Sequence, residues 1–375
     1  MKTYLFTDRL GAHSIWSLLD SISERLLLEG NNVIYCRFDD GKQGDPRTVP
    51  DGVTVYDIKV PEKKYVWDLY RQHKAFTKEL STIIKRHKVN LVHTNFAIPA
   101  ISARLTAKKC GVAIVSTQHE LYGSMSLHLR LGLRWTEKLC DHIVYISQTV
   151  ANTFTQGRNS SDKESIILNG IDVDGIATHT KPFAERSPNR IVCVGRMVPV
   201  KGQGLLLESL PSILKAHPST ELLFVGSGPD EPQLKDRCKQ LGLDQHVTFM
   251  GWLPRDQAMD LVSSSAIMAI PSDGKQEGFG LVVAEALALE VPIVCSDIPV
   301  FKEVAGDTAF MFKTGDSSSL ATTILDIFEN QVEAEKRTKK GKQLVMDKFT
   351  VDIMVDSYLK MYETLITEKF ITINE

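Results

Sequence analysis

The sequence predicts an α/β protein built from two parallel, helix-covered sheets, and three observations support this prediction. Strand-like and helix-like segments alternate along the chain, which is typical of parallel sheets with crossover helices. The length of 375 residues favours two domains, each large enough to bury a core. A polar segment without periodicity, 174–189, separates two series of strands. We therefore expect an N-terminal domain over 1–173, a linker over 174–189, a C-terminal domain over 190–349 and a final helix over 350–375.

Each expected strand is a short apolar run, and each expected helix has apolar positions at helical spacing. The first series of strands is expected at Thr3–Phe6, Asn32–Tyr35, Val53–Ile58, Leu91–His93, Ala113–Thr117 and His142–Ile146. The second series is expected at Arg190–Val194, Glu221–Val225, Val247–Phe249, Ile267–Ile270 and Pro292–Cys295. Helices are expected at Ser14–Leu28, Trp67–His87, Gly202–Lys215 and from Leu281 onward.

The tail carries an apolar stripe that predicts a C-terminal helix. Thr350 is a suitable N-cap residue for this helix. The apolar positions that follow recur at three- and four-residue spacing, so they would share one face. They are Val351, Met354, Val355, Tyr358, Tyr362, Leu365 and Ile366.

Composition and charge indicate a globular cytoplasmic protein. Hydrophobic residues make up 43% and charged residues 24% of the chain, both in the globular range. The formal net charge of −2 gives no reason to expect a nucleic acid partner. The six cysteines form no C-x-x-C pair, so reduced thiols are expected. The start, MKTYLFTDRL, is charged too early for a signal peptide, and no apolar run is long enough to span a bilayer.

The most informative segment runs from Glu277 to Glu285, where a glycine turn lies between two glutamates. Gly278 and Gly280 allow a ligand to approach the backbone closely. The helix expected from Leu281 opens out of this turn, so its free N–H groups and the positive end of its dipole suit a phosphate. In isolation, the pattern would favour a capped core helix with two surface glutamates. The surrounding motifs favour a ligand site.

Two cations follow the strand expected at 190–194. Arg196 and Lys201 lie between Gly195 and the helix expected from Gly202. Two cations beside a helix N-terminus would bind a diphosphate through charge-assisted hydrogen bonds. They would stabilise the transition state more than the ground state if charge grows on a departing nucleoside diphosphate. The structural alternative is a basic surface loop.

Together, these motifs resemble those of retaining glycosyltransferases with the GT-B fold, particularly glycosyltransferase family 4. The two glutamates resemble the family's E-x7-E signature, and residues 195–202 resemble its diphosphate-binding G-R-x4-K-G. Three further matches follow in the family's order: Asn169-Gly170-Ile171-Asp172 for N-G-I-D, Gly226-Ser227-Gly228-Pro229 for G-x-G-P, and Phe249-Met250-Gly251 for F-x-G. The resemblance spans nearly the whole chain.

The resemblance implies a GT-B fold: two Rossmann-like domains facing across a cleft, with the C-terminal helix crossing back to the first domain. The second domain would hold the donor, with Glu285 on the ribose hydroxyls and Glu277 on a hydroxyl of the transferred sugar. Glu277 could in principle be a nucleophile, although the resemblance favours charge stabilisation in a front-face transfer that retains configuration. The backbone of the turn would hold the sugar and the distal phosphate. The expected donor-binding residues are Gly11, Arg196, Lys201, Glu277, Gly278, Phe279, Gly280, Leu281 and Glu285.

The first domain would carry the acceptor. His119 ends an expected strand and matches the family's histidine that touches the donor sugar. By resemblance it acts with Glu277, Arg196 and Lys201 at the reaction centre. Gly11 stands where the family has a glycine-rich first loop, but the family commonly has paired glycines there and Leu10 precedes Gly11. A contact between His13 and the acceptor is therefore the alternative function of this loop.

No metal and no cofactor are expected. Asp172-Val173-Asp174 spells the D-x-D metal motif of another glycosyltransferase fold, but it lies within the N-G-I-D match. Gly226-Ser227-Gly228 begins like a dinucleotide fingerprint, yet Glu231 stands where the last glycine is required. No G-x-S-x-G segment supports a hydrolase.

Two basic segments rich in apolar residues leave peripheral membrane contact open. The segment 59–88 mixes Lys and Arg with four aromatic residues, and Leu127–Trp135 mixes Leu with Arg130 and Arg134. Basic amphipathic helices can lie on anionic lipid. An ordinary solvated helix face is the alternative interpretation.

The sequence thus predicts a metal-independent, retaining hexosyltransferase that uses a nucleoside diphosphate sugar, with a UDP-sugar preferred over GDP-mannose. The acceptor would be a glycan or a lipid-linked molecule in cell-surface polysaccharide biosynthesis. Two alternatives stay open: a sugar-nucleotide epimerase or phosphorylase on the same architecture, and a non-catalytic sugar-nucleotide-binding protein.

Overall fold

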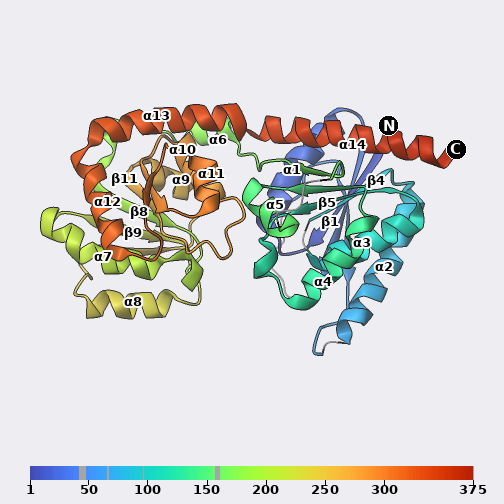
Figure 1. The fold of residues 1–375 in the computed structure, drawn as a ribbon, viewed down its shortest axis with the longest axis horizontal. Helices are drawn as coiled ribbons and strands as arrows, with labels where there is room; N and C mark the ends of the chain where they lie inside the picture. Colours follow the sequence, from blue (N-terminus) through green and yellow to red (C-terminus); the bar gives the residue numbers. More distant parts are fainter. Residues whose placement is uncertain (42–47, 66, 96, 157–160, 375) are drawn as a thin grey trace. The chain divides into compact units, whose positions relative to one another are not determined.

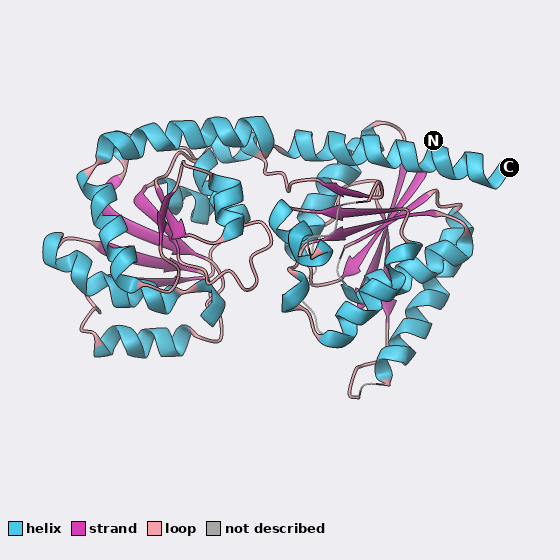
Figure 2. Ribbon diagram, viewed as in Figure 1, coloured by secondary structure: helices cyan, strands magenta, loops and turns pink. Residues whose placement is uncertain are grey.

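The computed structural model describes residues 1–41, 48–65, 67–95, 97–156 and 161–374. The chain divides into two compact units. Unit 1 combines Met1–Gly170 with Val351–Glu375, and unit 2 is Ile171–Thr350. Each unit contains one parallel sheet with helices on both faces, as Figure 2 shows. The predicted α/β class with two Rossmann-like domains is confirmed.

Unit 1 contains a seven-stranded parallel sheet in the order β3-β2-β1-β4-β5-β6-β7. Its strands are β1 (Thr3–Arg9), β2 (Asn32–Asp39), β3 (Thr54–Lys59), β4 (Leu91–Thr94), β5 (Ala113–Gln118), β6 (His142–Tyr145) and β7 (Glu164–Ile166). Its α-helices are α1 (His13–Leu28), α2 (Asp68–His87), α3 (Ala97–Cys110), α4 (Leu127–Thr136), α5 (Gln148–Thr155) and α14 (Val351–Asn374). Two 3₁₀ turns, Tyr122–Ser124 and Glu137–Leu139, flank α4.

The core of unit 1 follows the alternation of side chains along the strands. Tyr4 and Phe6 of β1 belong to the cluster beneath α1 and α14, whereas Leu5 belongs to the cluster beneath α2 and α3. Successive residues of a strand point to opposite faces, so a sheet with helices on both sides needs apolar residues at consecutive positions. This explains why the strands appear in the sequence as continuous apolar runs.

Helix α14 packs on unit 1, as predicted for the C-terminal helix, and lies against α1 in Figure 1. Its apolar stripe is buried apart from Val351, which is half-buried, and two of its tyrosines bond to the sheet. The Tyr362 hydroxyl lies 2.6 Å from Nδ1 of His93, and the Tyr358 hydroxyl lies 3.1 Å from Oγ1 of Thr117. These buried hydrogen bonds join the last helix of the chain to β4 and β5. The Lys369 ammonium adds an ion pair to Asp141 at 2.9 Å.

Unit 2 contains a six-stranded parallel sheet in the order β10-β9-β8-β11-β12-β13. Its strands are β8 (Ser187–Val194), β9 (Glu221–Val225), β10 (Val247–Gly251), β11 (Ser265–Ile270), β12 (Ile293–Ser296) and β13 (Phe310–Phe312). Its α-helices are α6 (Val173–Ala177), α7 (Gln203–Ala216), α8 (Glu231–Gln240), α9 (Arg255–Ser263), α10 (Leu281–Ala288), α11 (Pro299–Ala305), α12 (Ser317–Glu329) and α13 (Gln331–Lys348). Two 3₁₀ turns occur at Phe183–Glu185 and Pro199–Lys201.

The segment that the sequence suggests as a linker, 174–189, lies in unit 2 and contains regular structure. Asp172 accepts a hydrogen bond from the Gly175 amide at 3.0 Å and thereby caps α6. Strand β8 begins at Ser187, although Pro188 has no N–H for the ladder. The pairing of β8 with β11 shifts register between Ser265 and Ile267, which accommodates the proline.

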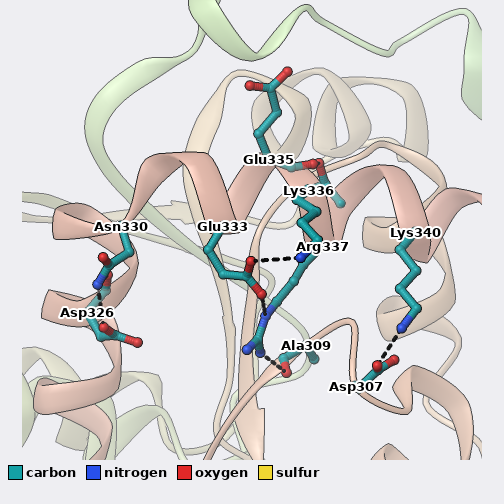
Figure 3. Close-up of polar contacts among 10 residues, drawn as sticks. Asp307, Ala309, Asp326, Asn330, Glu333, Glu335, Lys336, Arg337 and Lys340 are labelled. Atoms are coloured by element: carbon teal, nitrogen blue, oxygen red, sulfur yellow. Dashed lines mark hydrogen bonds and ion pairs between the residues drawn. The ribbon is translucent and has the colours of Figure 1, made fainter.

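Arg337 of helix α13 reaches the edge strand β13 and the residue before it (Figure 3). The Arg337 guanidinium donates to the Ala309 carbonyl oxygen at 3.2 Å and to Glu333 at 2.9 Å. It also lies over the Phe310 ring, 4.2 Å from the centroid. Arg337 thus links α13 to the edge strand, while Lys336 and Lys340 of the same helix are exposed.

Both sheets reverse strand order at one point, and this is where ligands of open α/β sheets bind. In unit 1 the reversal lies between β1 and β4, and in unit 2 it lies between β8 and β11. The loops that leave these strands carry most of the predicted site residues. Gly11 follows β1, Arg196 and Lys201 follow β8, and Glu277 follows β11.

Candidate active site

The loop after β8 has a firmly held backbone. The Gly195 amide donates to the Val225 carbonyl oxygen at 2.9 Å, and the Met197 amide donates to that of Ser227 at 2.9 Å. The Gln203 side chain donates to the Arg196 carbonyl oxygen at 3.1 Å. The exposed Arg196 side chain therefore projects from a main chain that is fixed on both sides.

Two glycines allow the neighbouring loops to pack backbone against backbone. Gly202 has a φ of +73°, and a Cβ placed there would lie 2.0 Å from the Pro271 carbonyl oxygen. Gly226 has a φ of +125°, and its Cβ would lie 2.2 Å from the Gly195 carbonyl oxygen. No side chain fits at either position, since real Cβ atoms do not approach this closely. Gly226, the first glycine of the G-x-G-P turn, therefore allows the ends of β8 and β9 to pack together.

Glu277 is the most buried charged group of the site and is paired with Lys201. The Lys201 ammonium contacts Oε1 of Glu277, and the Ser272 hydroxyl donates to the same oxygen at 2.9 Å. Glu277 is only 8% exposed, so the cation and the hydroxyl offset the cost of burying its charge. Among the described residues, both contacts use Oε1, so acceptor capacity remains at Oε2 for a ligand hydroxyl.

The turn after Glu277 opens directly into α10. Gly280 has a φ of +83°, and a Cβ there would lie 2.8 Å from the Phe301 ring, so the helix starts from a position that only glycine fills well. The Phe279 side chain is buried, and its ring meets the ring of Phe349 edge-on with centroids 5.6 Å apart. Phe279 therefore anchors the turn in the core, and its backbone is the part that a ligand can use.

Glu285 lies in the second turn of α10 and forms an ion pair with Arg255. The Arg255 guanidinium donates to Oε1 of Glu285 at 3.1 Å. Burial raises the pKa of the Glu285 carboxyl, and the nearby Arg255 opposes that increase. Arg255 is the first residue of α9, where the helix dipole disfavours a cation. Its contact with Glu285 gives a reason for a cation at this position.

In unit 1, His119 lies just beyond the end of β5 and contacts Asn95 beyond the end of β4. The His119 Nε2 atom lies 3.0 Å from Oδ1 of Asn95. Burial lowers the pKa of His119 to about 3, so the imidazole is neutral at physiological pH. Gly11 lies in an exposed turn in which the Ala12 amide donates to the Arg9 carbonyl oxygen at 3.1 Å. The side chain of His13 lies outside the described residues.

Two family descriptions match adjacent parts of the chain. "Glycosyltransferase Family 4" matches residues 18–174, and "Glycosyl transferases group 1" matches residues 177–344.

The chain belongs to glycosyltransferase family 4.

Similar proteins agree with this assignment. A phosphatidyl-myo-inositol mannosyltransferase of Mycobacterium leprae is 28% identical over 261 residues, which cover 68% of each chain. A GDP-mannose-dependent monoacylated alpha-(1-6)-phosphatidylinositol monomannoside mannosyltransferase of Corynebacterium glutamicum is 28% identical over 294 residues, 73% of this chain and 76% of the relative. The crystal structure of HepE from Anabaena in complex with UDP and glucose superposes with a TM-score of 0.80 at 17% identity and covers 97% of this chain and all of that one. This likeness shows the GT-B fold.

The predicted site residues of this glycosyltransferase are divided between the two units. Unit 2 brings Lys201 into contact with Glu277, and places the turn 278–280 at the start of α10. Glu285 lies farther along the same helix and contacts Arg255, not Lys201. His119 and Gly11 belong to unit 1.

Sequence reasoning missed the partners of the predicted residues. Ser272, Arg255 and Asn95 each contact one of them, yet none belongs to a motif that the sequence analysis identified. Arg255 had a detectable signal, since a cation in the first turn of a helix is unusual. Ser272 and Asn95 follow parallel strands, a position that often carries site residues.

A hollow of about 400 Å³ lies beside the loop after β8. Its lining includes Gly202, Gln203, Asp230, Arg237 and Asp273. The side chains of Lys201 and Glu277 are not part of this lining, so the hollow is separate from their ion pair.

The part of the chain that the structure describes contains no cluster of His, Cys, Asp and Glu that could hold a metal ion. The first aspartate of Asp172-Val173-Asp174 caps α6, which gives the D-x-D sequence a structural role. None of the described helices combines the length and the apolar character needed to cross a membrane.

Proposed function

We propose that this glycosyltransferase transfers a hexosyl unit from a nucleoside diphosphate sugar with retention of configuration and without a metal ion or cofactor. The observation that carries the proposal is the ion pair between Lys201 and Glu277. Glu277 also accepts a hydrogen bond from Ser272, and it lies just before the turn from which α10 begins. This arrangement combines a cation for a phosphate, a carboxylate for sugar hydroxyls and a helix N-terminus at one edge of the sheet.

Lys201 and Arg196 are proposed to hold the diphosphate. As the bond between the sugar and the diphosphate breaks, negative charge grows on the leaving group and the two cations stabilise it. These positive charges take over the role that a divalent metal has in metal-dependent phosphate chemistry. Main-chain amides of the turn 278–280 and the positive end of α10 add donors at the same place.

Glu277 is proposed to accept a hydroxyl of the transferred sugar and to stabilise positive charge at its anomeric carbon. Its ion pair with Lys201 and its hydrogen bond from Ser272 hold the carboxylate in place, which favours positioning and charge stabilisation. His119 is neutral and contacts Asn95, so it would contribute a hydrogen bond and no charge. Gly11 completes the proposed donor contacts from unit 1, and Glu285 is proposed to bind the ribose hydroxyls.

For the donor, we propose a UDP-sugar, with GDP-mannose as the alternative. The HepE structure has the same fold and contains UDP and glucose, which supports a UDP-sugar. The relative from C. glutamicum, named for its dependence on GDP-mannose, supports the alternative. Arg196, Lys201 and the turn 278–280 contact phosphate and sugar in this scheme, so they suit either donor.

For the acceptor, we propose a lipid-linked molecule in cell-surface polysaccharide biosynthesis. Both mannosyltransferase relatives are named for phosphatidylinositol-type acceptors, and together they support a lipid-linked class for this chain. A glycan without a lipid is the alternative acceptor.

The test is a thermal-shift screen with UDP, GDP, ADP and their common sugars, followed by a transfer assay. A nucleotide that binds the native state raises its melting temperature by mass action. We expect UDP or GDP to give the largest shift, and Glu277→Ala to keep nucleotide binding while losing transfer. Unaltered transfer by Glu277→Ala would exclude Glu277 from the site.

The same assays separate the rival functions. An epimerase would release free sugar from the nucleotide without an acceptor, which chromatography of the products would show. A non-catalytic binding protein would give the thermal shift but no product with any acceptor. A glycosyltransferase gives a nucleoside diphosphate and a glycosylated acceptor in equal amounts.

A further inference from the structure

Helix α4 exposes an apolar stripe to solvent. Leu127, Leu131 and Trp135 lie at i, i+4 and i+8, so they share one face, and they are 62%, 59% and 65% exposed. The opposite face of the same helix already covers a core, because Leu133 is buried in a cluster with Ala100. A surface helix needs only one apolar face to pack on its domain. The second face of α4 therefore requires another explanation.

Three exposed aromatic residues lie at the start of α2. Tyr65, Trp67 and Tyr70 are 58%, 65% and 68% exposed, and the rings of Tyr65 and Trp67 stack with centroids 4.7 Å apart. Helix α3 contacts both α2 and α4, so the three helices form one layer of unit 1. The first turns of α2 and the whole of α4 lie along the lower edge of that unit in Figure 1. We call these six residues the α2–α4 face.

Basic residues surround both parts of the α2–α4 face. The segment 59–74 contains five basic and two acidic residues, a net charge of +3, and 127–138 contains three basic and one acidic, a net charge of +2. The whole chain has a formal net charge of −2, so positive charge is concentrated here. Lys63, Lys74, Arg134 and Lys138 are exposed.

We infer that the α2–α4 face docks on an anionic lipid surface. Tryptophan and tyrosine favour the boundary between lipid headgroups and acyl chains, and lysine and arginine beside them attract anionic headgroups. Aromatic residues also occur in protein interfaces, so the argument for lipid is the excess of positive charge around the face, which an anionic membrane complements. Docking by this face is independent of the donor chemistry proposed above, since the face lies in unit 1 and shares no residue with the proposed donor site.

The test is cosedimentation of the full-length protein with vesicles of phosphatidylcholine, with and without phosphatidylglycerol. We expect binding to the anionic vesicles that weakens as salt is added, because the headgroup attraction is screened. Leu131→Ser combined with Trp135→Ser should lower the vesicle partition coefficient about tenfold or more, because both side chains would otherwise be buried in lipid. Arg134→Gln combined with Lys138→Gln should reduce binding and its salt dependence together.

The matched control is Val332→Ser on α13 in unit 2, an apolar residue that is 85% exposed outside the α2–α4 face. It should bind vesicles like the unaltered protein. Circular dichroism of each variant checks folding, which exposed substitutions should preserve. Absence of wild-type binding to anionic vesicles, or equal binding by the Leu131/Trp135 variant, would overturn the inference. So would a dimer in light scattering that the same variant converts to a monomer, since the stripe would then be a contact between copies.

Discussion

The two units place different kinds of polar group at the carboxyl ends of their sheets. In unit 2 the groups are charged and paired, Lys201 with Glu277 and Arg255 with Glu285. In unit 1 two histidines, His93 and His119, lie at or just beyond these ends, and burial lowers the pKa of each to about 3. Arg9 and Asp40 also form an ion pair at this edge of unit 1. The contrast is therefore between the lysine–glutamate pair of unit 2, which suits a diphosphate, and the neutral histidines of unit 1, which suit hydroxyl groups. Although both sheets are parallel and helix-covered, their edges differ in electrostatics.

The largest effect is expected from Lys201→Met. The change removes a proposed diphosphate contact and leaves the buried Glu277 with Ser272 as its remaining hydrogen-bond donor among the described residues. We expect kcat/KM for transfer to fall by about two to three orders of magnitude, as for the loss of one charge-stabilising donor.

Steady-state kinetics with saturating acceptor measures this loss. Lys336→Met is the matched control, because Lys336 is an exposed lysine of unit 2 on the outer surface of α13 (Figure 3). Transfer rates that fall equally in both variants would contradict a specific role of Lys201 in transfer.

A smaller effect with a pH signature is expected from Arg255→Met. Burial raises the pKa of Glu285, and Arg255 works against this, so removal of the arginine raises the pKa further. The carboxylate that would bind the ribose is then protonated at a higher pH. Nucleotide affinity should fall by about tenfold, as for the loss of a hydrogen bond to a charged group, and the deficit should grow as pH falls.

Calorimetric titration of nucleotide between about pH 5 and 8 tests this prediction, since ordinary carboxyls stay ionised over that range. Arg255→Lys should restore part of the affinity at the higher pH values. If the loss of nucleotide affinity in Arg255→Met did not change with pH, Arg255 would act independently of the Glu285 carboxyl.

A weaker effect is expected from His119→Gln in unit 1. The amide can still bond to Asn95, and a neutral hydrogen bond is worth about 0.5–1.5 kcal/mol, so transfer should fall about tenfold or less. His119→Ala should be more harmful. Because the pKa of His119 is about 3, the rate profile between about pH 5 and 8 should keep its shape in His119→Gln. If the unaltered protein showed a change of rate near pH 6 that His119→Gln lacks, His119 would titrate in that range. The neutral state of this histidine would then be wrong.

The smallest effect is expected from Tyr362→Phe, which removes the hydroxyl that contacts His93. Loss of this buried hydrogen bond should destabilise unit 1 by about 1 kcal/mol and lower its melting temperature by about 2–4 °C. Thermal unfolding followed by circular dichroism measures the shift. Tyr70→Phe, at an exposed tyrosine, should leave the melting temperature unchanged. Equal shifts in both variants would contradict the role of the buried hydroxyl.

The sequence was a good guide to the fold wherever elements were long or fully buried. The strands from β1 to β6 and from β8 to β12 lie where apolar runs predict them. The strands β7 and β13 were missed because three residues at a sheet edge are too few for a pattern. The first residues of β8 were missed because a proline argues against a central strand, and the register shift opposite Pro188 depends on the partner strand.

For the candidate site, the sequence identified side chains but not their pairings. Lys201 and Glu277 are 76 positions apart, and only the strand order β8–β11 brings their loops together. The cation beside Glu285 comes from α9, which no motif includes. Local patterns reveal which residue types are present, whereas the electrostatics of the site depend on contacts between distant segments.

The chain passes from one unit to the other twice, near Ile171 and near Thr350. These two places lie side by side, because the Ile171 amide donates to the Phe349 carbonyl oxygen at 2.8 Å and Ile171 forms a bridge with Thr350. Unit 2 is one continuous stretch of chain, but unit 1 lacks α14 until the residues after unit 2 are synthesised. During translation, the C-terminal unit can therefore finish folding before the N-terminal one. Until then Tyr4 and Phe6 lack their final cover, and a nascent chain stalled near residue 350 would present that apolar surface to chaperones.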